Sequence, residues 1–194
     1  MNINPVEYKE YPLEVAGVKR NLPICKVNDN LYIAAFVIFG DVELTKACAT
    51  ELVKMLPEHD VLITAEAKGI PLIYEMARQI NAKRYLIARK SPKLYMKNPS
   101  AVEVQSITTS KIQTLYIDKD DADYMREKRV VIVDDVISTG ESAMAVEKLV
   151  TESGGVVAGR MAILAEGDAS DRKDIIYLEK LPLFFTNGTI PTKS

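Results

Sequence analysis

Short apolar runs alternate with amphipathic stretches through the middle of the chain. Each run is dominated by β-forming side chains, which is typical of strands buried on both faces of a parallel sheet. The runs are residues 61–64, 84–88, 130–133 and 156–164. Helix-like stretches lie between them and end near Leu56, Ile80 and Val150. Strands that alternate with helices predict an α/β fold with a mostly parallel central sheet flanked by helices.

The N-terminal part of the chain has a different pattern. Residues 1–12 are expected to be a loosely held lead-in, because Pro5 and Pro12 restrict regular structure. Residues 13–39 contain two β-rich runs around an Asn-Asp-Asn turn at residues 28–30. This pattern predicts a hairpin or a small sheet before the first helix, for which Asp41 is the expected cap.

The remaining segments complete one expected domain over residues 1–194. Two further strands are expected before residue 118, then a helical turn, and two short strands near the C-terminus after an acidic loop at residues 166–174. The expected parts are an N-terminal hood segment at 13–39, a core at 40–165 and a C-terminal hood or edge segment at 166–194.

Most of the candidate functional residues lie in residues 130–142, whose sequence is VVIVDDVISTGES. We expect the strand to stop at Asp134 and Asp135, and a helix to begin at Glu141 after a loop of small residues. Such a loop lets backbone N–H groups approach an anion, and a helix start adds unsatisfied N–H groups and partial positive charge. Two carboxylates hold vicinal hydroxyls or hydrated Mg²⁺. The stretch therefore predicts a sugar-phosphate site.

This order of strand, two acids and Ser-Thr-Gly loop resembles the motif with which type I phosphoribosyltransferases bind phosphoribosyl pyrophosphate (PRPP). The resemblance implies the type I phosphoribosyltransferase fold with a small β-rich hood. It implies that Asp134 and Asp135 hold the ribose hydroxyls and, through water, Mg²⁺, and that Val136 contacts the base. The residues implied to wrap the 5′-phosphate are Ser138, Thr139, Gly140, Glu141 and Ser142.

A second candidate loop, Glu66-Ala67-Lys68-Gly69, follows the apolar run at 61–64. A small loop between a strand and a helix lies at the carboxyl edge of a parallel sheet, where ligands bind. The loop is similar to the Glu-Ala/Ser-x-Gly pyrophosphate loop of the adenine and xanthine phosphoribosyltransferase branch. That similarity implies pyrophosphate contacts for Ala67, Lys68 and Gly69.

The segment between Met76 and Val102 has no acidic residue. Its basic residues are Arg78, Lys83, Arg84, Arg89, Lys90, Lys93 and Lys97. We interpret the loop at 89–98 as an active-site lid whose uncovered positive charge, at Arg89, Lys90 and Lys93, stabilises a pyrophosphate leaving group. A solvated basic surface is the alternative. Together with the two acids, Arg89 and Lys93 are the expected catalytic residues.

Two other functions are alternatives to this hypothesis. A Walker-type hydrolase is disfavoured because the nearest approach to its phosphate loop, GGVVAGRM at 154–161, lacks both the lysine and the hydroxyl residue. One position departs from the adenine-enzyme pattern, since the expected loop glutamate falls near Thr109. A non-catalytic PRPP or nucleotide sensor that binds RNA through residues 76–102 is therefore the alternative function.

The composition of the chain further restricts its possible functions and locations. The 194 residues are 47% hydrophobic and 27% charged, with a net charge of -2, which argues against general nucleic-acid affinity. No apolar run approaches the roughly 20 residues of a membrane span. Cys25 and Cys48 are expected to be buried free thiols of a reducing compartment. We expect a cytoplasmic purine-salvage transferase that uses PRPP, a purine base and Mg²⁺, forms a homodimer, and binds neither DNA nor membrane.

Overall fold

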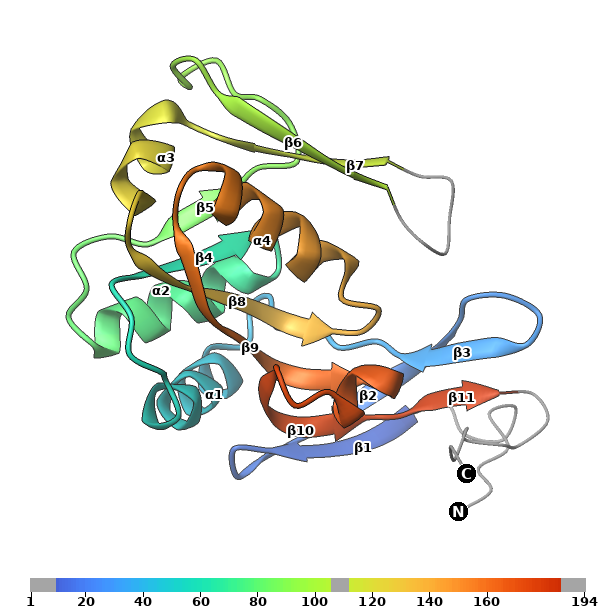
Figure 1. The fold of residues 1–194 in the computed structure, drawn as a ribbon. Coiled ribbons are helices and arrows are strands. Elements are labelled where there is room, and N and C mark those ends of the chain that lie inside the picture. The colour runs from blue at the N-terminus through green and yellow to red at the C-terminus, as the bar shows by residue number, and fades with distance from the viewer. Residues whose placement is uncertain (1–9, 106–111, 186–194) are drawn as a thin grey trace.

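A five-stranded parallel sheet forms the centre of the protein. The computed structural model describes residues 10–105 and 112–185 (Figure 1). In spatial order the strands of this sheet are β10 (Ile176–Leu181), β9 (Val156–Glu166), β8 (Arg129–Ile137), β4 (Val61–Ala65) and β5 (Leu86–Ala88). All neighbouring pairs in this sheet run parallel. The predicted α/β fold with a parallel central sheet is therefore confirmed.

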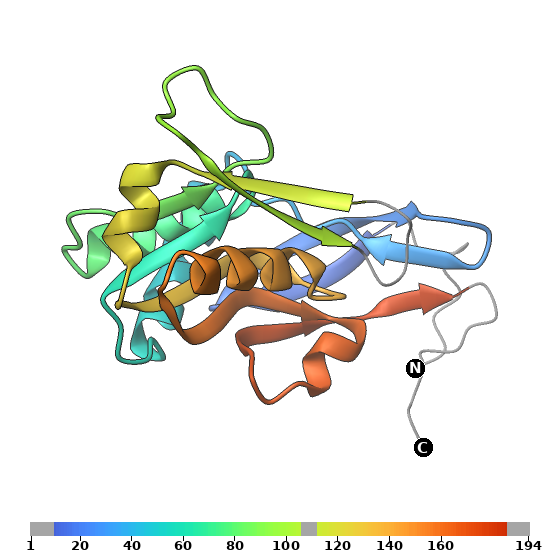
Figure 2. The same cartoon turned by 45° about the horizontal axis from the view of Figure 1, so that its top comes forward.

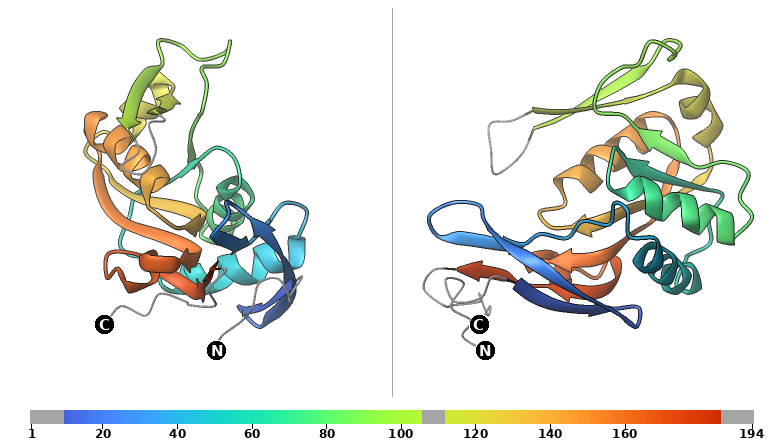
Figure 3. Two further views of the ribbon diagram at one scale, coloured as in Figure 1. Left: turned by 90° about the vertical axis from the view of Figure 1, so that its right-hand side faces the viewer. Right: turned by 180° about the vertical axis from the view of Figure 1, so that it is seen from behind.

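Helices cover both faces of the sheet, as Figure 3 shows. The helices α1 (Val42–Lys54) and α2 (Gly69–Gln79) lie against one face, and α4 (Glu141–Glu152) lies against the other. The start of α1 follows from the sequence, because Asp41 Oδ1 accepts a hydrogen bond from the Leu44 N–H at 3.0 Å. The predicted cap of this helix is confirmed.

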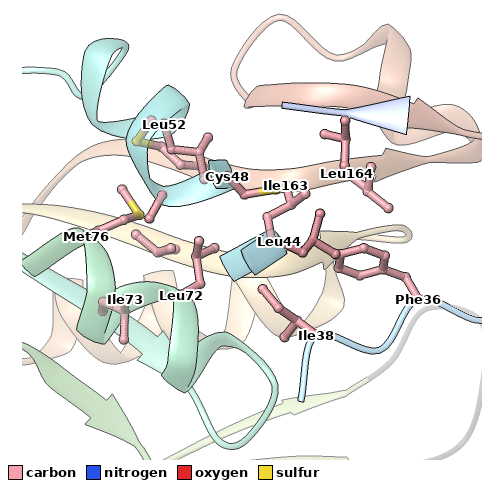
Figure 4. Packing of buried hydrophobic residues seen from close by; sticks show 14 of the residues in the cluster. Phe36, Ile38, Leu44, Cys48, Leu52, Leu72, Ile73, Met76, Ile163 and Leu164 are labelled. Carbon is pink, nitrogen blue, oxygen red and sulfur yellow. The ribbon is translucent and has the colours of Figure 1, made fainter. Parts of the chain in front are cut away.

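The strand β8 is buried on both of its faces. Val131 and Val133 pack in the hydrophobic cluster that contains α1 and α2. Val130 and Ile132 pack in the cluster that contains α4. Figure 4 shows the first cluster, where side chains of both helices meet those of β9. Two-sided burial explains why this strand is a continuous apolar run in the sequence.

The prediction that β8 stops at the two acids is wrong. The strand continues to Ile137, because the long neighbour β9 offers parallel partners as far as Ala165. Asp134 and Asp135 therefore lie inside the last part of the strand, and the loop of small residues begins only at Ser138. This extension fixes the backbone of both acids in a sheet.

A four-stranded antiparallel sheet, which we call the hood, packs beside the central sheet (Figure 2). Its strands in order are β1 (Glu10–Val15), β2 (Val18–Lys26), β3 (Leu31–Ala34) and β11 (Leu183–Phe185). The last of them comes from the C-terminal segment, so both ends of the described chain build the hood. An ion pair also links hood and core, because Arg20 Nε lies 2.6 Å from Asp41 Oδ2.

The hood confirms one sequence prediction and corrects two. The turn at residues 28–30 joins β2 to β3, with Asn28 Oδ1 accepting two backbone N–H groups at 2.9 Å. The first β-rich run, however, splits into two strands at Ala16 and Gly17, whose φ values are 52° and 75°. Residues 10–12 belong to β1 and not to a loose lead-in, whereas residues 1–9 lie outside the described residues.

A hairpin of β6 (Ser100–Gln105) and β7 (Ile112–Ile117) lies over α4 (Figures 1 and 2). Lys148 Nζ on α4 donates to the Glu103 carbonyl at 2.9 Å, which ties the two elements together. The two strands expected before residue 118 are confirmed and pair as a hairpin, but position 109 lies outside the described residues. The helix α3 (Lys119–Met125) and the short 3-10 helix η1 (Gly167–Asp171) complete the described chain.

Two remaining expectations concern membrane spans and thiols. In the part of the chain that the structure describes, none of the helices combines the length and apolarity needed to cross a membrane. Both cysteines are free, but only Cys48 is buried. The prediction that Cys25 is buried is wrong, because it lies on β2, where alternate side chains face away from the core.

Candidate functional site

Three loops that leave parallel strands converge at one edge of the central sheet. They are the 66–69 loop after β4, the 89–98 loop after β5 and the 138–142 loop after β8. Lys68 Nζ in the first loop lies 2.6 Å from Asp135 Oδ2 at the end of β8. Glu66 Oε1 in the same loop lies 3.4 Å from Arg89 Nη2 in the second loop. These two ion pairs join the 66–69 loop to the end of β8 and to the 89–98 loop.

The two acids of β8 differ in their surroundings. Asp135 is only 2% exposed and has Lys68 as its cationic partner. Asp134 Oδ1 accepts a hydrogen bond from the Asp135 backbone N–H at 2.9 Å. Burial, and then the neighbouring charge of Asp135, raise the pKa of Asp134 well above its ordinary value. Ligand hydroxyls or a cation beside this pair would stabilise its ionised form.

The 138–142 loop encloses a small polar cavity. The cavity measures about 100 Å³, and its lining runs from Asp134 and Val136 through the loop to Ala143. Gly140 adopts a left-handed φ of 81° and stands at the N-cap of α4 without a side chain to cap it. The N-cap residue of this helix thus leaves its first N–H groups without a cap of its own, and the start of a helix favours an anion.

The 66–69 loop is packed too tightly to accept larger side chains. A Cβ on Gly69 would lie 2.1 Å from Thr64 Oγ1 and 3.4 Å from Asp134 Oδ1. The close approach to Thr64 at the end of β4 therefore requires glycine at position 69. Ala67 lies beside it, and the peptide between Glu66 and Ala67 is cis.

The prediction of uncovered positive charge in the 89–98 loop needs correction. Glu66 Oε1 lies 3.4 Å from Arg89 Nη2 and 3.8 Å from Lys93 Nζ, and Glu66 Oε2 accepts the Lys90 backbone N–H at 3.1 Å. A single carboxylate thus faces two of the cations. Arg89 Nε is nevertheless buried without a hydrogen-bond acceptor among the described residues. The side chain of Lys90 is exposed.

Two charged residues of this edge, Glu166 and Arg172, are not among the site residues that the sequence predicts. Glu166 ends β9, and burial raises the pKa of its carboxyl while the charge of Lys68 opposes the shift. Arg172 follows η1 and lies against Gly140 of the 138–142 loop. The strand order could have pointed to them, because the chain that leaves β9, like the chain that leaves β8, reaches the carboxyl edge of the sheet, where ligands bind.

The basic segment does not form a continuous uncompensated patch. Arg78 donates to both carboxylate oxygens of Glu75, at 2.7 and 2.8 Å. Arg84 forms an ion pair with Asp121 from α3. Lys83 remains exposed. Acids from outside the segment therefore neutralise part of the surface on which the RNA-binding alternative depends.

The acids of β8 suit a magnesium ion shared with a substrate. Among residues 10–105 and 112–185, no group of three or more His, Cys, Asp or Glu side chains could hold a metal alone. Magnesium, however, commonly retains several waters and uses one or two carboxylates together with substrate phosphates. Asp134 and Asp135 provide such a donor set.

Comparison with known proteins places this site in a family. The family model described as phosphoribosyl transferase domain matches residues 44–180, which is more than half of the chain. This chain belongs to that family. The match contains all three loops of the site, whereas β1, β2, β3 and β11 of the hood lie outside it. The resemblance seen in the sequence is confirmed.

Individual relatives agree with this placement. The chain is 25% identical over 158 residues to the hypoxanthine/guanine phosphoribosyltransferase of Ferroglobus placidus, covering 79% of this chain and 80% of the relative. It is 32% identical over 124 residues to the adenine phosphoribosyltransferase of Brachyspira hyodysenteriae, covering 64% and 68%. The crystal structure of adenine phosphoribosyltransferase from Thermoanaerobacter pseudethanolicus superposes with a TM-score of 0.61 at 26% identity, covering 74% of this chain and 84% of that one.

Proposed function

We propose that this protein transfers the phosphoribosyl group of PRPP to a purine base, giving a nucleoside monophosphate and pyrophosphate in purine salvage. The observation that carries the proposal is the end of β8. There Asp134 lines a small polar cavity at the start of α4, and Asp135 faces the 66–69 loop through a 2.6 Å ion pair with Lys68. A ligand with hydroxyls between two phosphate groups fits this order of subsites.

The ribose 5-phosphate end of PRPP would bind along β8 and the following loop. Backbone N–H groups and hydroxyls of Ser138, Thr139 and Ser142 would donate to the 5′-phosphate at the start of α4, where Gly140 is the N-cap residue. The ribose hydroxyls would donate to Asp134 and Asp135. Because Asp135 is paired with Lys68, ribose binding would partly replace that contact.

The leaving group would bind between the other two loops. Lys68 and the backbone of Ala67 and Gly69 would face pyrophosphate from one side, and Arg89, Lys90 and Lys93 from the other. Arg89 Nε is a buried donor without an acceptor among the described residues, so a phosphate oxygen would satisfy it. Two of these cations would exchange the carboxylate of Glu66 for pyrophosphate oxygens.

The reaction would form one bond and break another. A nitrogen of the base bonds to the anomeric carbon, the bond from that carbon to the pyrophosphate oxygen breaks, and the base loses its N–H proton to solvent. Charge leaves with the pyrophosphate, so cations fixed at the leaving group lower the barrier. Asp134 and Asp135 would hold Mg²⁺ through water, where it would neutralise pyrophosphate charge.

The base would lie between Val136 and the hood. Val136 is half-buried and lines the same cavity as Asp134 and the 138–142 loop. The hood lies outside the part of the chain that the family model matches, which suits an element that distinguishes one base from another.

We propose a homodimer and a cytoplasmic location as further properties. Val42 and Tyr74 are exposed and line a cavity of about 250 Å³ between the starts of α1 and α2, and Val37 and Phe39 are exposed in the segment that leads to α1. A second copy that presents the same surface would bury these side chains across a two-fold axis. The two free thiols suit a reducing compartment.

The test of the function is pyrophosphate release from PRPP and Mg²⁺ with adenine, guanine, hypoxanthine, xanthine, uracil or orotate. We expect turnover with a purine and its loss in the double variant Asp134→Asn, Asp135→Asn. If the wild-type protein binds PRPP by calorimetry but no base gives pyrophosphate, the protein is a sensor and the proposed reaction is wrong.

A further inference from the structure

Arg172 brings a cationic side chain to the 138–142 loop from another part of the chain. The residue follows η1, where its backbone N–H donates to the Ala169 carbonyl at 3.2 Å. Its Nη1 atom lies 2.6 Å from the position that a Cβ on Gly140 would take, and its Cζ lies 3.9 Å from it. The guanidinium group therefore packs directly against the glycine at the start of α4.

The guanidinium group is held in a defined orientation. Nε lies 3.0 Å from Asp174 Oδ1, and Nη2 lies 2.6 Å from Asp174 Oδ2. This two-point contact lowers the pKa of Asp174 to about 2, so the carboxylate is ionised at neutral pH. Because Asp174 takes Nε and Nη2, the atom directed toward Gly140 is Nη1, which is outside this contact.

A second arginine anchors Asp174 to the scaffold. Arg160 on β9 places Nη1 3.5 Å from Asp174 Oδ2. Its Nε and Nη2 donate to Glu147 Oε2 on α4 at 3.1 and 2.5 Å. Alternating charges thus run from α4 through β9 to Arg172, and they fix Arg172 relative to the helix that begins in the 138–142 loop.

The charge balance of this loop explains why a further cation is useful. A phosphate dianion beside α4 would meet the carboxylates of Asp134 and Asp135, and Glu141 lies in the first turn of the helix. Lys68 is already paired with Asp135. Helix N–H groups supply only a partial positive charge. A guanidinium group at the loop would offset the repulsion and donate N–H groups to phosphate oxygens.

We propose that Arg172 is a binding residue for the 5′-phosphate of PRPP, and that Asp174 positions it. This inference rests on the proposed function of the site. It gives the acidic loop at residues 166–174 a defined part in substrate binding, through Arg172, which lies against the 138–142 loop.

The test compares Arg172→Gln with Lys173→Gln, which removes an equal charge from the exposed neighbouring residue. Calorimetry with Mg²⁺ would measure binding of ribose 5-phosphate, which carries the phosphate in question, and of inorganic pyrophosphate, which does not. We expect Arg172→Gln to weaken ribose 5-phosphate binding about tenfold or more and to leave pyrophosphate binding within about twofold. Lys173→Gln should change neither.

Two further variants and one kinetic measurement complete the test. Arg172→Lys should recover part of the affinity, and Asp174→Asn should lose part of it because Arg172 is no longer oriented. In turnover, the KM for PRPP should rise in Arg172→Gln, while the KM for the base stays unchanged. Equal affinity of Arg172→Gln and wild type for ribose 5-phosphate overturns the inference alone. Absence of PRPP binding by the wild-type protein overturns the proposed function as well.

Discussion

Lys68 Nζ lies 2.6 Å from Asp135 Oδ2, so a loop after β4 and the end of β8 are joined by an ion pair across 67 positions of sequence. Asp135 is buried, whereas the Lys68 side chain is 45% exposed. The lysine is therefore the partner that can leave when a ligand arrives. The acid requires a replacement partner, which ribose hydroxyls can supply.

Breaking this pair from the lysine side should destabilise the protein. Lys68→Gln leaves a buried carboxylate without its cation, and we expect the free energy of unfolding to fall by about 1–3 kcal/mol. Adding Asp135→Asn to the Lys68→Gln variant removes the carboxylate charge that has lost its cation. In urea unfolding, the double variant should lose less stability than the sum of the two single variants. Strict additivity would show that the pair contributes nothing.

Replacing Asp134 should alter how stability depends on pH. Burial and Asp135 raise the folded-state pKa of Asp134, so its protonated form is favoured in the native protein. The associated stability is present at acid pH and is lost as pH rises through the raised pKa. Asp134→Asn carries no charge, and it should become more stable than wild type above that pKa, by at least about 1 kcal/mol.

The measurement is urea unfolding of both proteins from pH 4 to pH 9. The difference in unfolding free energy should be smallest at the acid end and should grow toward neutrality. Asp120→Asn, at an exposed acid of α3, is the control and should show no such growth. A constant difference for Asp134→Asn would exclude its titration as the cause. The gain in stability should accompany loss of PRPP turnover.

The sequence predicted those parts of the site that depend on local patterns. The apolar runs identified β4 and β8, and parallel topology alone brought their loops to one edge. The extension of β8 to Ile137 was not predictable, because it depends on the length of its neighbour β9. The pairing of Glu66 with Arg89 and Lys93, and the approach of Arg172, likewise depend on tertiary contacts between segments far apart in sequence.

Gly140 should be required for two separable reasons. Its φ of 81° disfavours any side chain, at a cost of about 1–2 kcal/mol, and a Cβ there would meet Arg172 Nη1 at 2.6 Å. Gly17 offers a matched control, because its φ is 75° and a Cβ would meet nothing within 4 Å. Both alanine variants should lose similar stability in thermal unfolding. Only Gly140→Ala should also weaken PRPP binding; equal PRPP affinity in the two variants would contradict this reading.

Glu66 should compete with pyrophosphate for the cations of the 89–98 loop. Its carboxylate lies within 4 Å of Arg89 and Lys93, so pyrophosphate must displace it to reach both. Glu66→Gln keeps the shape and removes the charge. We therefore expect pyrophosphate to bind the variant roughly three- to tenfold more tightly, as one weakened ion pair would allow.

Ionic strength separates this competition from a change in loop structure. Added salt screens the attraction between pyrophosphate and the loop cations in both proteins, but in wild type it also weakens the competing contact with Glu66. The affinity for pyrophosphate should accordingly fall more steeply with salt in Glu66→Gln than in wild type. Glu10→Gln, at an exposed acid of the hood, should match wild type throughout. Weaker pyrophosphate binding by Glu66→Gln at low salt would mean that Glu66 organises the cations for the ligand and does not compete with it.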